Sequence, residues 1–378
     1  MKKILVVYAT AGIGHKKASL AVKEALEEVA PKDTEISIID SLDYTNSFFR
    51  WSYLNSYLLM INKMPTLWGL AYYLTDNFFV NLIISKIRRL SNWLNSGKLA
   101  DYLVRTKPDV IISTHFLASE VIGDLKKHGI VQSRLITIVT DYKLHLWWLA
   151  DSTDMYVVGS DSAREELLKQ KVAEDKIEVL GIPAEPVFSK PLDKDRIFEK
   201  ENIAKDIFTI LVIGGGFGIG PIEEIIKAID TVSSRPIQVI AVCGRNEELM
   251  KRLENLRDRL SIQLKVMGFV NNVYEYMEVS NILISKSGGI TVAESLAKEI
   301  PMIVIAPIIG QETRNSDFLM DNGAAIRLTS VSELKAAVED LISHPEKLER
   351  LKQAIRAIKK PAACYDIAKL VLEMCGNG

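Results

Sequence analysis

The sequence predicts an α/β protein made of two doubly wound halves. Apolar runs of strand length alternate with helical patterns along most of the chain, an order typical of parallel sheets covered by helices. In both halves the first apolar run ends in a glycine-rich turn, around Gly12 and Gly14 and again over residues 214–220, and a helical pattern follows at once. Residues 184–206 mix prolines with charged residues and lack an apolar period. We therefore predict a linker there, between a first domain of residues 1–190 and a second of residues 191–360.

Length and composition indicate the class of protein. The chain has 378 residues, of which 48% are hydrophobic and 25% charged, and a net charge of -1, values typical of a globular protein with large cores. This near-neutral charge gives no indication of nucleic acid as a partner. Cys243, Cys364 and Cys375 form an odd set without metal-type spacing, which favours reduced thiols in a cytoplasmic protein.

Neither a secretion signal nor a membrane span is predicted. Gly12, Gly14 and His15 interrupt the first apolar run too early for a signal peptide. Elsewhere no uncharged apolar run reaches the roughly 18 residues that a spanning helix needs. We expect a protein that is not integral to the membrane.

Apolar runs predict the buried strands of both halves. The runs cover residues 4–8, 110–113, 135–140, 155–158 and 177–180, and then 208–213, 238–242, 282–284 and 301–307. A stripe of Ile222, Ile225, Ile226 and Ile229 marks the helix after the first strand of the second half. We expect the last helix, residues 361–378, to pack back on the first domain.

The turn after residue 284 is typical of a phosphate-binding site. Ser287, Gly288 and Gly289 separate a strand from a helix that includes Thr291 and Glu294. Glycines let an anion approach the backbone, a helix N-terminus favours negative charge, and the two hydroxyl groups are additional donors. An ordinary strand-to-helix connection is the alternative.

A polar loop predicted at residues 310–315 adds specificity to this turn. Gln311, Glu312 and Asn315 follow a buried strand, and ligands of open α/β sheets lie outside the carboxyl ends of strands. Amide, carboxylate and guanidinium groups suit a polyhydroxylated ligand, because each sugar hydroxyl both donates and accepts. Arg245, at another strand end, is a candidate for neutralising a diphosphate, and a surface arginine without that role is the alternative.

His15, at the end of the first glycine turn, is a candidate general base. A neutral imidazole suits that role near neutral pH, and a helix cap is the alternative. Dinucleotide binding is disfavoured at this turn, because Lys17 occupies the place of the third glycine. Asp141 and His145 follow the strand 135–140 beside two tryptophans and are further candidates, with simple turn capping as the alternative.

Between residues 41 and 103 the composition changes. Aromatic side chains are crowded there, among them Phe48, Trp51, Tyr57, Tyr72, Phe78 and Phe79. Basic residues border or follow this segment, namely Arg50, Lys63, Lys86, Arg88, Arg89, Lys98, Arg105 and Lys107. Rings at headgroup depth and cations near anionic lipid are typical of peripheral membrane proteins. Ordinary packing against the sheet is the alternative.

Several segments, in a fixed order, resemble one family. They are GIGHKKAS (12–19), TDYKLHLWW (140–148), VIGGGFGIGP (212–221), VCGRN (242–246), MGFV (267–270), SGGITVAE (287–294), PIIGQETRN (307–315) and DNGAA (321–325). Together they resemble the diacylglycerol glycosyltransferases of the GT-B fold, meaning bacterial processive diacylglycerol glucosyltransferases and plant monogalactosyldiacylglycerol synthases, which are related to the enzyme that completes lipid II. The resemblance covers nearly the whole chain.

The resemblance implies a transferase with two Rossmann-like domains facing a central cleft. It implies an inverting transfer of a hexose from a UDP-sugar to diacylglycerol or a glycosyl-diacylglycerol, with His15 as the base and Asp141 as the competing choice. Glu294 would hold the ribose, and Gln311 and Glu312 the hexose. The expected donor-binding residues are Gly215, Gly216, Arg245, Phe269, Ser287, Gly288, Gly289, Thr291, Glu294, Gln311, Glu312 and Asn315, and the expected acceptor-binding residues are Gly14, His145 and Trp148. Thr10 departs from the family, because plant members tend to have Asp there.

No metal or cofactor is expected. The sequence lacks a compact DxD-type acidic site, so helix N-termini, hydroxyl groups and Arg245 are expected to stabilise the leaving diphosphate. The expected partners are a UDP-hexose, diacylglycerol and the anionic inner face of the cell membrane. Two alternatives stay open. One is a UDP-sugar epimerase of the same fold, against which the aromatic segment argues, and the other is a nucleotide- or lipid-binding module without turnover.

Overall fold

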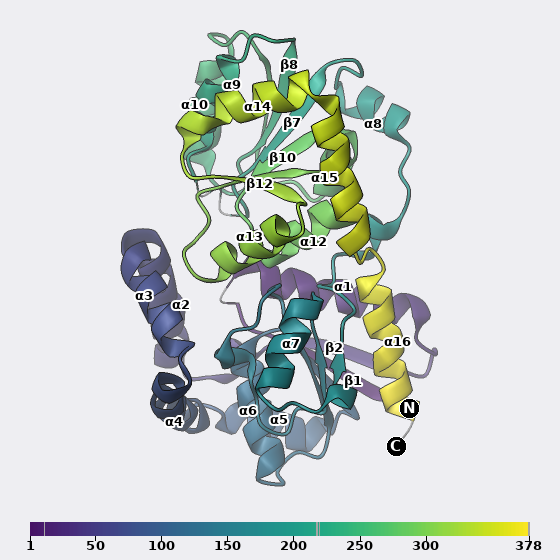
Figure 1. Cartoon of the computed structure of the whole chain (residues 1–378). Helices are drawn as coiled ribbons and strands as arrows, with labels where there is room; N and C mark the ends of the chain where they lie inside the picture. The colour runs from purple at the N-terminus through teal and green to yellow at the C-terminus, as the bar shows by residue number, and fades with distance from the viewer. Residues whose placement is uncertain (11, 217, 219, 377–378) are drawn as a thin grey trace. The chain divides into compact units, whose positions relative to one another are not determined.

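The computed structural model describes residues 1–10, 12–216, 218 and 220–376 (Figure 1). Within that range the side chains of residues 54, 57, 58, 61, 62 and 78 are not described, so the expectations placed on Tyr57 and Phe78 lie outside the described side chains. The chain divides into two compact units. The first comprises Met1–Pro186, Ile308–Arg314 and Ala362–Gly378, and the second comprises Val187–Pro307 and Asn315–Pro361.

The first unit contains a six-stranded parallel sheet in the order β2-β1-β3-β4-β5-β6. Its strands are β1 (Lys3–Tyr8), β2 (Glu35–Asp40), β3 (Val110–Ser113), β4 (Arg134–Ile138), β5 (Met155–Val157) and β6 (Ile177–Glu178). In the centre Leu5 pairs with Ile111, and both side chains are buried. Because β2 and β3 lie on opposite sides of β1, the strand order reverses between β1 and β3.

Helices cover both faces of this sheet. They are α1 (Ile13–Val29), α2 (Ser47–Lys63), α3 (Pro65–Thr75), α4 (Phe78–Leu94), α5 (Gly97–Thr106), α6 (Phe116–Lys127), α7 (Asp161–Lys169) and α16 (Ala363–Gly376), with 3-10 turns η1 (Ser41–Tyr44), η2 (Leu146–Trp148) and η3 (Glu174–Lys176). The last helix, α16, lies beside α1 (Figure 1). Its Ile367 and Val371 share one core with Val22 and Leu26 of α1.

The aromatic segment forms the helices α2, α3 and α4. Successive helices of this group pack on each other, and α4 packs on α6 (Figure 1). Asn46 caps α2 and Asn77 caps α4 through their side-chain oxygens, which satisfies backbone donors that have no partner within a helix. No helix in the described part of the chain combines the length and apolar character needed to cross a membrane.

The second unit repeats the architecture with the strand order β12-β11-β10-β7-β8-β9. Its strands are β7 (Phe208–Ile213), β8 (Ile237–Val242), β9 (Gln263–Met267), β10 (Ile282–Ser285), β11 (Met302–Ile305) and β12 (Ala325–Leu328). Its helical elements are α8 (Lys194–Glu201), α9 (Ile222–Asp230), α10 (Glu247–Arg257), α11 (Val273–Val279), α12 (Gly289–Ala297), η5 (Val331–Glu333), α14 (Leu334–Ser343) and α15 (Pro345–Ile358). The turn η4 (Pro186–Ser189) leads into this unit, and α13 (Gln311–Asp321) begins in the segment 308–314.

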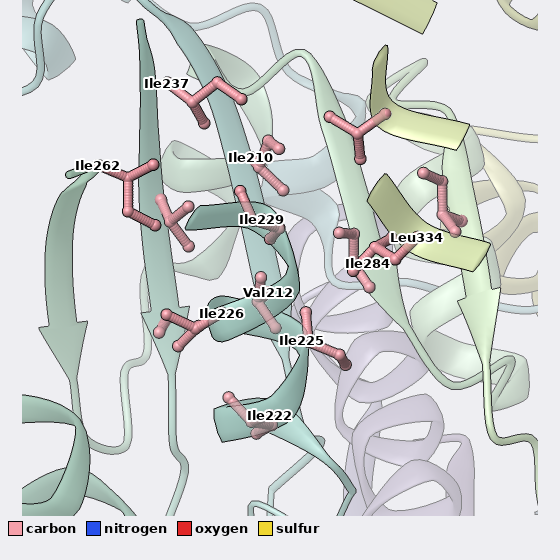
Figure 2. Packing of buried hydrophobic residues seen from close by; sticks show 14 of the residues in the cluster. Ile210, Val212, Ile222, Ile225, Ile226, Ile229, Ile237, Ile262, Ile284 and Leu334 are labelled. Atoms are coloured by element: carbon pink, nitrogen blue, oxygen red, sulfur yellow. The ribbon is translucent and has the colours of Figure 1, made fainter. Parts of the chain in front are cut away.

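The core of the second unit shows why these residues fold together. The predicted stripe of α9 points onto β7, where Ile226 and Ile229 lie against Ile210 and Val212 (Figure 2). Ile226 and Ile229 have no exposed surface, and burying an isoleucine side chain contributes roughly 1.5 to 3 kcal/mol. The doubly wound α/β architecture predicted from the sequence is confirmed in each unit.

Three strands escape sequence prediction, and one predicted loop is wrong. The strands β2, β9 and β12 lie at sheet edges and are only partly buried, so they lack the continuous apolar runs that mark central strands. The residues from Gln311 onward form the helix α13 rather than a loop. Helical backbone hydrogen bonds organise these polar side chains, such as the one from Arg314 N to Gly310 O at 3.0 Å.

Candidate active site

Polar loops gather at the point in each sheet where the strand order reverses. In the first unit this switch point lies between β1 and β3, and in the second it lies between β7 and β10. Ligands of open α/β sheets bind outside the carboxyl ends of strands at such points. Residues 9, 10 and 12 follow β1, residues 214–216, 218 and 220 follow β7, and residues 286–288 follow β10.

His15 lies in the first turn of α1 and links three strand ends. Its Nδ1 is 2.8 Å from the carbonyl oxygen of Thr114, which follows β3, and 3.0 Å from Oγ1 of Thr140, which follows β4. A carbonyl oxygen only accepts hydrogen bonds, so Nδ1 carries the proton. The neutral imidazole therefore has its lone pair on Nε2, the atom that can accept a proton from a substrate.

Burial keeps this imidazole neutral. Loss of hydration lowers the pKa of His15, while the charge of Asp141 and the Thr114 carbonyl oppose that change. A histidine pKa lowered from its ordinary value near 6.5 leaves the base form dominant at neutral pH. The lowered pKa thus favours a neutral His15, and the hydrogen bond to Thr114 places its one ring proton on Nδ1.

Aromatic rings surround His15. The ring of His115 lies edge-on to it with centroids 4.4 Å apart, and His115 is 1% exposed. Burial and the neighbouring His15 lower the pKa of His115 well below its usual range. The indole Nε1 of Trp148, whose ring lies 6.2 Å from that of His15, donates to Asp141 Oδ2 at 3.3 Å. The tryptophan therefore fixes the carboxylate that acts on the base.

Hydroxyl groups hold the backbone of this turn. Thr114 Oγ1 is 2.8 Å from Ser19 Oγ and donates to the carbonyl oxygen of His15 at 3.0 Å. Before the turn, the backbone N–H of Thr10 donates to Asp40 Oδ1 at 3.3 Å, and its hydroxyl donates to the other oxygen of the same carboxylate. Asp40 thus supplies a carboxylate next to the position where plant members of the resembling family tend to have one.

His145 forms hydrogen bonds to the backbone of the first unit through both of its ring nitrogens. Its Nε2 donates to the carbonyl oxygen of Tyr72 at 3.0 Å, and its Nδ1 accepts from the backbone N–H of Trp147 at 3.1 Å. It is 2% exposed, and burial lowers its pKa to about 4. Both ring nitrogens are engaged, so the structure gives His145 a role in positioning the loop 141–148. Trp148 is equally buried, and its indole N–H holds the carboxylate of Asp141.

In the second unit the loops after β7 and β8 interlock through their backbones. Gly218 has φ +60°, and a Cβ there would lie 2.0 Å from the carbonyl oxygen of Cys243. A Cβ on Gly244, with φ +58°, would lie 2.7 Å from the carbonyl oxygens of Gly215 and Gly216. The backbone N–H of Arg245 donates to Gly216 O at 3.2 Å. Glycine is required at both close approaches.

This interlock places Arg245 beside Phe269. The guanidinium carbon lies 5.5 Å from the centre of the Phe269 ring, and both residues are exposed. They follow β8 and β9, at the same edge of the sheet as the glycine loop. By contrast, a Cβ on Gly215 would meet no atom within 4 Å, so open space borders the backbone there.

The turn after β10 presents the first backbone N–H groups of α12. The N-cap residue of this helix is Gly288, which has no side chain to cap it, so an anion can approach the N-terminal donors. Ser285 Oγ donates to the carbonyl oxygen of Ile213 at 2.9 Å and ties β10 to β7. Ser287 and Glu294 are buried, and Thr291 is half-buried one turn into the helix.

The segment 308–314 belongs to the first unit. The Glu312 carboxylate accepts from the backbone N–H of Ile308 at 2.6 Å, which fixes the start of α13. A Cβ on Gly310 would lie 2.8 Å from the ring of Tyr72. Arg314, expected among the groups that hold a sugar, instead donates to the Leu144 carbonyl oxygen at 2.5 Å and to Asp76. Gln311 is half-buried, and Asn315, the next donor candidate, is fully buried.

Comparisons with known proteins agree with this architecture. The family model "Monogalactosyldiacylglycerol (MGDG) synthase" matches residues 15–184, and the model "Glycosyltransferase family 28 C-terminal domain" matches residues 209–371. A protein named processive diacylglycerol beta-glucosyltransferase from Bacillus cereus (strain G9842) is 28% identical over 376 residues, covering 98% of this chain and 93% of its own. Over nearly its whole length, the chain is therefore similar to diacylglycerol glycosyltransferases.

Solved structures similar to this chain share its fold. Acinetobacter baumannii MurG superposes with a TM-score of 0.65 at 15% identity, covering 99% of this chain and 100% of its own. The S. aureus MnaA-UDP structure superposes with a TM-score of 0.62 at 15% identity, covering 99% and 98%. The GT-B fold and the family resemblance predicted from the sequence are therefore confirmed. At these identities the structural likeness bears on the fold alone.

The outer surface of α4, within the aromatic segment of residues 41–103, carries an exposed apolar stripe. Phe79, Ile83, Ile87, Leu90 and Leu94 recur at helical spacing, and each is at least 60% exposed. The exposed apolar surface therefore continues beyond Phe79 along the whole of α4. Contiguous exposed apolar surface of this kind marks an interaction site on soluble proteins.

Arg88 and Arg89 do not belong to that surface. The prediction that they contact lipid is wrong, because both form ion pairs within the first unit. Arg88 Nε donates to Glu120 Oε2 at 2.9 Å, and Nη2 donates to Oε1 at 2.9 Å. The Glu120 side chain is 1% exposed. Arg89 pairs with Asp151 at 2.9 Å. Helical spacing turns both arginines toward α6, because they lie on the face opposite the exposed apolar stripe.

His115 and Thr140 were not among the residues predicted for the site. Their signal was their position directly after β3 and β4, at the edge of the sheet where ligands bind. Among the described residues, no group of three or more His, Cys, Asp or Glu side chains is arranged to hold a metal ion.

Proposed function

We propose that this chain transfers a hexose from a UDP-sugar to diacylglycerol or a glycosyl-diacylglycerol, with inversion at the anomeric carbon. His15 Nε2 takes the proton of the acceptor hydroxyl as its oxygen bonds to the anomeric carbon. The bond from that carbon to the diphosphate oxygen breaks, and UDP leaves with the electron pair. The proposal rests on the similarity to diacylglycerol glycosyltransferases and on the first unit's switch point, where Thr114 holds the His15 proton on Nδ1.

The second unit supplies the donor side of this proposal. The uncapped N-terminus of α12 at Gly288 and Gly289, with the hydroxyl groups of Ser287 and Thr291, binds the diphosphate. The open backbone at Gly215, next to Gly216, lets the nucleotide approach closely. The exposed pair of Arg245 and Phe269 contributes a cation and a ring, and the cation balances charge that develops on the leaving group.

Carboxylate and amide groups hold the sugars of the donor. We assign Glu294 to the ribose, and Gln311, Glu312 and Asn315 to the hexose. Glu294 and Glu312 are buried, and a buried polar group that loses its partner costs about 1 to 3 kcal/mol. Such positions discriminate strongly between correct and incorrect hydroxyl patterns.

On the acceptor side Asp141 is the alternative base. Its carboxylate is half-buried, receives the Trp148 indole N–H and raises the pKa of His15. We assign it to the support of the imidazolium that forms during transfer, a role that requires a fixed negative charge. Gly14, next to His15 in the first turn of α1, leaves room for the acceptor hydroxyl, and His145 positions the loop that carries Asp141.

The exposed stripe of α4 docks the enzyme on the surface of an anionic membrane. A diacylglycerol acceptor stays in the bilayer, so an enzyme that uses it must bring its site to the surface. Ile83 and Ile87 are both 66% exposed, and insertion of such side chains into the interface is favourable. Lys63, Lys86 and Lys98 are exposed and replace Arg88 and Arg89 as the cations that meet anionic lipid. We place the enzyme at the inner face of the cell membrane.

Incubation with diacylglycerol vesicles tests the activity. With UDP-glucose or UDP-galactose as donor, the expected product is a glycolipid together with UDP. A UDP-sugar epimerase would interconvert the sugar nucleotide without vesicles, and a binding module would release no UDP. Either of those two results, with no glycolipid formed, would overturn the proposed transfer.

Vesicle sedimentation tests the docking surface separately. We expect Ile83→Ser with Ile87→Ser to reduce binding to anionic vesicles and to leave UDP affinity unchanged. Ile130→Ser, at an exposed isoleucine elsewhere on the first unit, is the matched control. Lys86→Gln tests a docking cation in the same way, and we expect it to reduce binding to anionic vesicles. Lys32→Gln, at an exposed lysine elsewhere on the first unit, is its matched control. Arg88 is left in place, because removing one partner of a buried ion pair costs roughly 3 to 5 kcal/mol.

A further inference from the structure

The second unit contains a hollow at the edge of its sheet opposite the donor loops. Its volume is about 500 Å³, within the range of small-molecule sites. Ser280 lines it just before β10, and Ile300 lines it just before β11. The hollow therefore opens at the amino ends of the strands, whereas Gly215 and Gly288 lie at the carboxyl ends.

Cations outnumber carboxylates around this hollow. Its charged lining residues are Lys190, Lys194, Lys298, Lys352, Arg356, Lys359, Glu278 and Glu299, a net of four positive charges. The C-terminal ends of α11 and α12 also point there, and each contributes about half a negative charge. A positive excess remains after that partial compensation.

Both carboxylates are already shared between cations. Glu278 lies 3.4 Å from Lys194 Nζ and 3.1 Å from Lys298 Nζ. Glu299 lies 2.7 Å from Arg356 Nε and 2.6 Å from Lys359 Nζ. Glu349, outside the hollow, also pairs with Arg356 Nη1 at 2.8 Å. The unbalanced positive charge therefore lies with Lys194 and Lys298, which share Glu278.

Lys298 and Lys352 are the lining cations that most favour an anionic ligand. The side chain of Lys298 is 3% exposed, and its Nζ also donates to the Lys190 carbonyl oxygen at 3.1 Å. Burial makes a positive charge costly unless it is matched. Lys352 is half-buried at the rim and has no ion pair within the described part of the chain. A ligand with several negative charges would balance the buried charge of Lys298, which shares Glu278 with Lys194, and would pair with Lys352.

We propose that this hollow binds a small, multiply charged phosphate group, either free or on the headgroup of a lipid. A phosphate offers several acceptor oxygens, which ammonium and guanidinium groups bind through charge-assisted hydrogen bonds. The site is distinct from the donor loops and does not depend on the transferase activity proposed above.

Calorimetric titration of inorganic pyrophosphate into the full-length protein with UDP at saturation tests this site. Saturating UDP occupies the donor loops, so the remaining binding reports on other sites. We expect saturable binding that Lys352→Gln weakens about tenfold, a loss of roughly 1.4 kcal/mol. Arg350→Gln is the matched control, because it removes the same charge from α15 at an exposed position outside the hollow. Unchanged UDP affinity shows that both variants are folded.

A second titration with short-chain phosphatidic acid distinguishes the two sources of phosphate. Binding of pyrophosphate that depends on Lys352 supports a free phosphate ligand. Binding of the lipid alone, with the same dependence, supports a headgroup. If neither probe binds saturably, or if Arg350→Gln weakens binding as much as Lys352→Gln does, the proposed site is wrong.

Discussion

The two switch points share a topology and differ in chemistry. At the first, between β1 and β3, aromatic rings and the Thr140 hydroxyl group surround the imidazole of His15, whose basic nitrogen is Nε2. At the second, between β7 and β10, glycines and an uncapped helix end present backbone N–H groups. The comparison teaches that strand order fixes where a ligand binds, whereas the loop residues decide whether the site activates a hydroxyl group or holds an anion.

The largest expected effect separates these two roles. His15→Ala should lower turnover by a factor of about 10² to 10⁴, the usual contribution of a general base, and should leave UDP affinity unchanged. Steady-state kinetics and UDP titration measure the two quantities. His344→Ala, at an exposed histidine of the second unit, serves as the control. A parallel loss of UDP affinity would show that the two switch points do not divide the work in this way.

Two glycines of the second switch point sharpen the comparison. In Gly218→Ala the new methyl group would lie 2.0 Å from the Cys243 carbonyl oxygen, so both loops must shift. We expect lower UDP affinity and a loss of unfolding free energy of about 1 to 3 kcal/mol. In Gly215→Ala the methyl group meets no protein atom, so the stability cost should be only about 1 kcal/mol, from the left-handed backbone. UDP affinity should still fall, because the methyl group occupies the space through which the nucleotide approaches. Urea denaturation combined with UDP titration distinguishes them, and equal stability losses would contradict the interlock.

A smaller effect is expected at Glu312. Glu312→Ala should lower turnover about tenfold, in line with the loss of one buried polar contact. Glu312→Gln keeps a carbonyl oxygen for the Ile308 N–H and therefore separates fixing of the loop from contact with the hexose. Equal losses in both variants indicate a contact that needs the carboxylate charge. Unchanged kinetics in Glu312→Ala would remove this residue from the donor site.

The sequence predicted the centre of each sheet better than its edges. Continuous apolar runs such as 208–213 mark strands that are buried on both faces, and all six residues of β7 are buried. The edge strand β2 has only one fully buried residue, so its pattern gives no such signal. Edge strands pair on one side only, and their identity depends on neighbours that are distant in the sequence.

The positions of the candidate site residues could be predicted from the sequence, but their contacts could not. Glycine turns and strand ends located His15, Gly215 and Gly288 correctly at the switch points. The sequence could not show that Arg88 turns inward to Glu120, a partner 32 residues away. Nor could it show that both nitrogens of His145 are engaged. Such contacts depend on tertiary packing, which periodicity and composition do not encode.

The pH dependence of kcat/KM in Asp141→Asn tests the central claim most directly. In the wild type the rate should fall on the acid side at a pH below about 6.5, because burial lowers the pKa of His15 and the base must be neutral. The Asp141 charge raises that pKa, so its removal should move the acid limb to lower pH while transfer persists at a reduced rate. Loss of transfer at every pH, well beyond the loss in His15→Ala, would show that Asp141 is the base and that His15 is not.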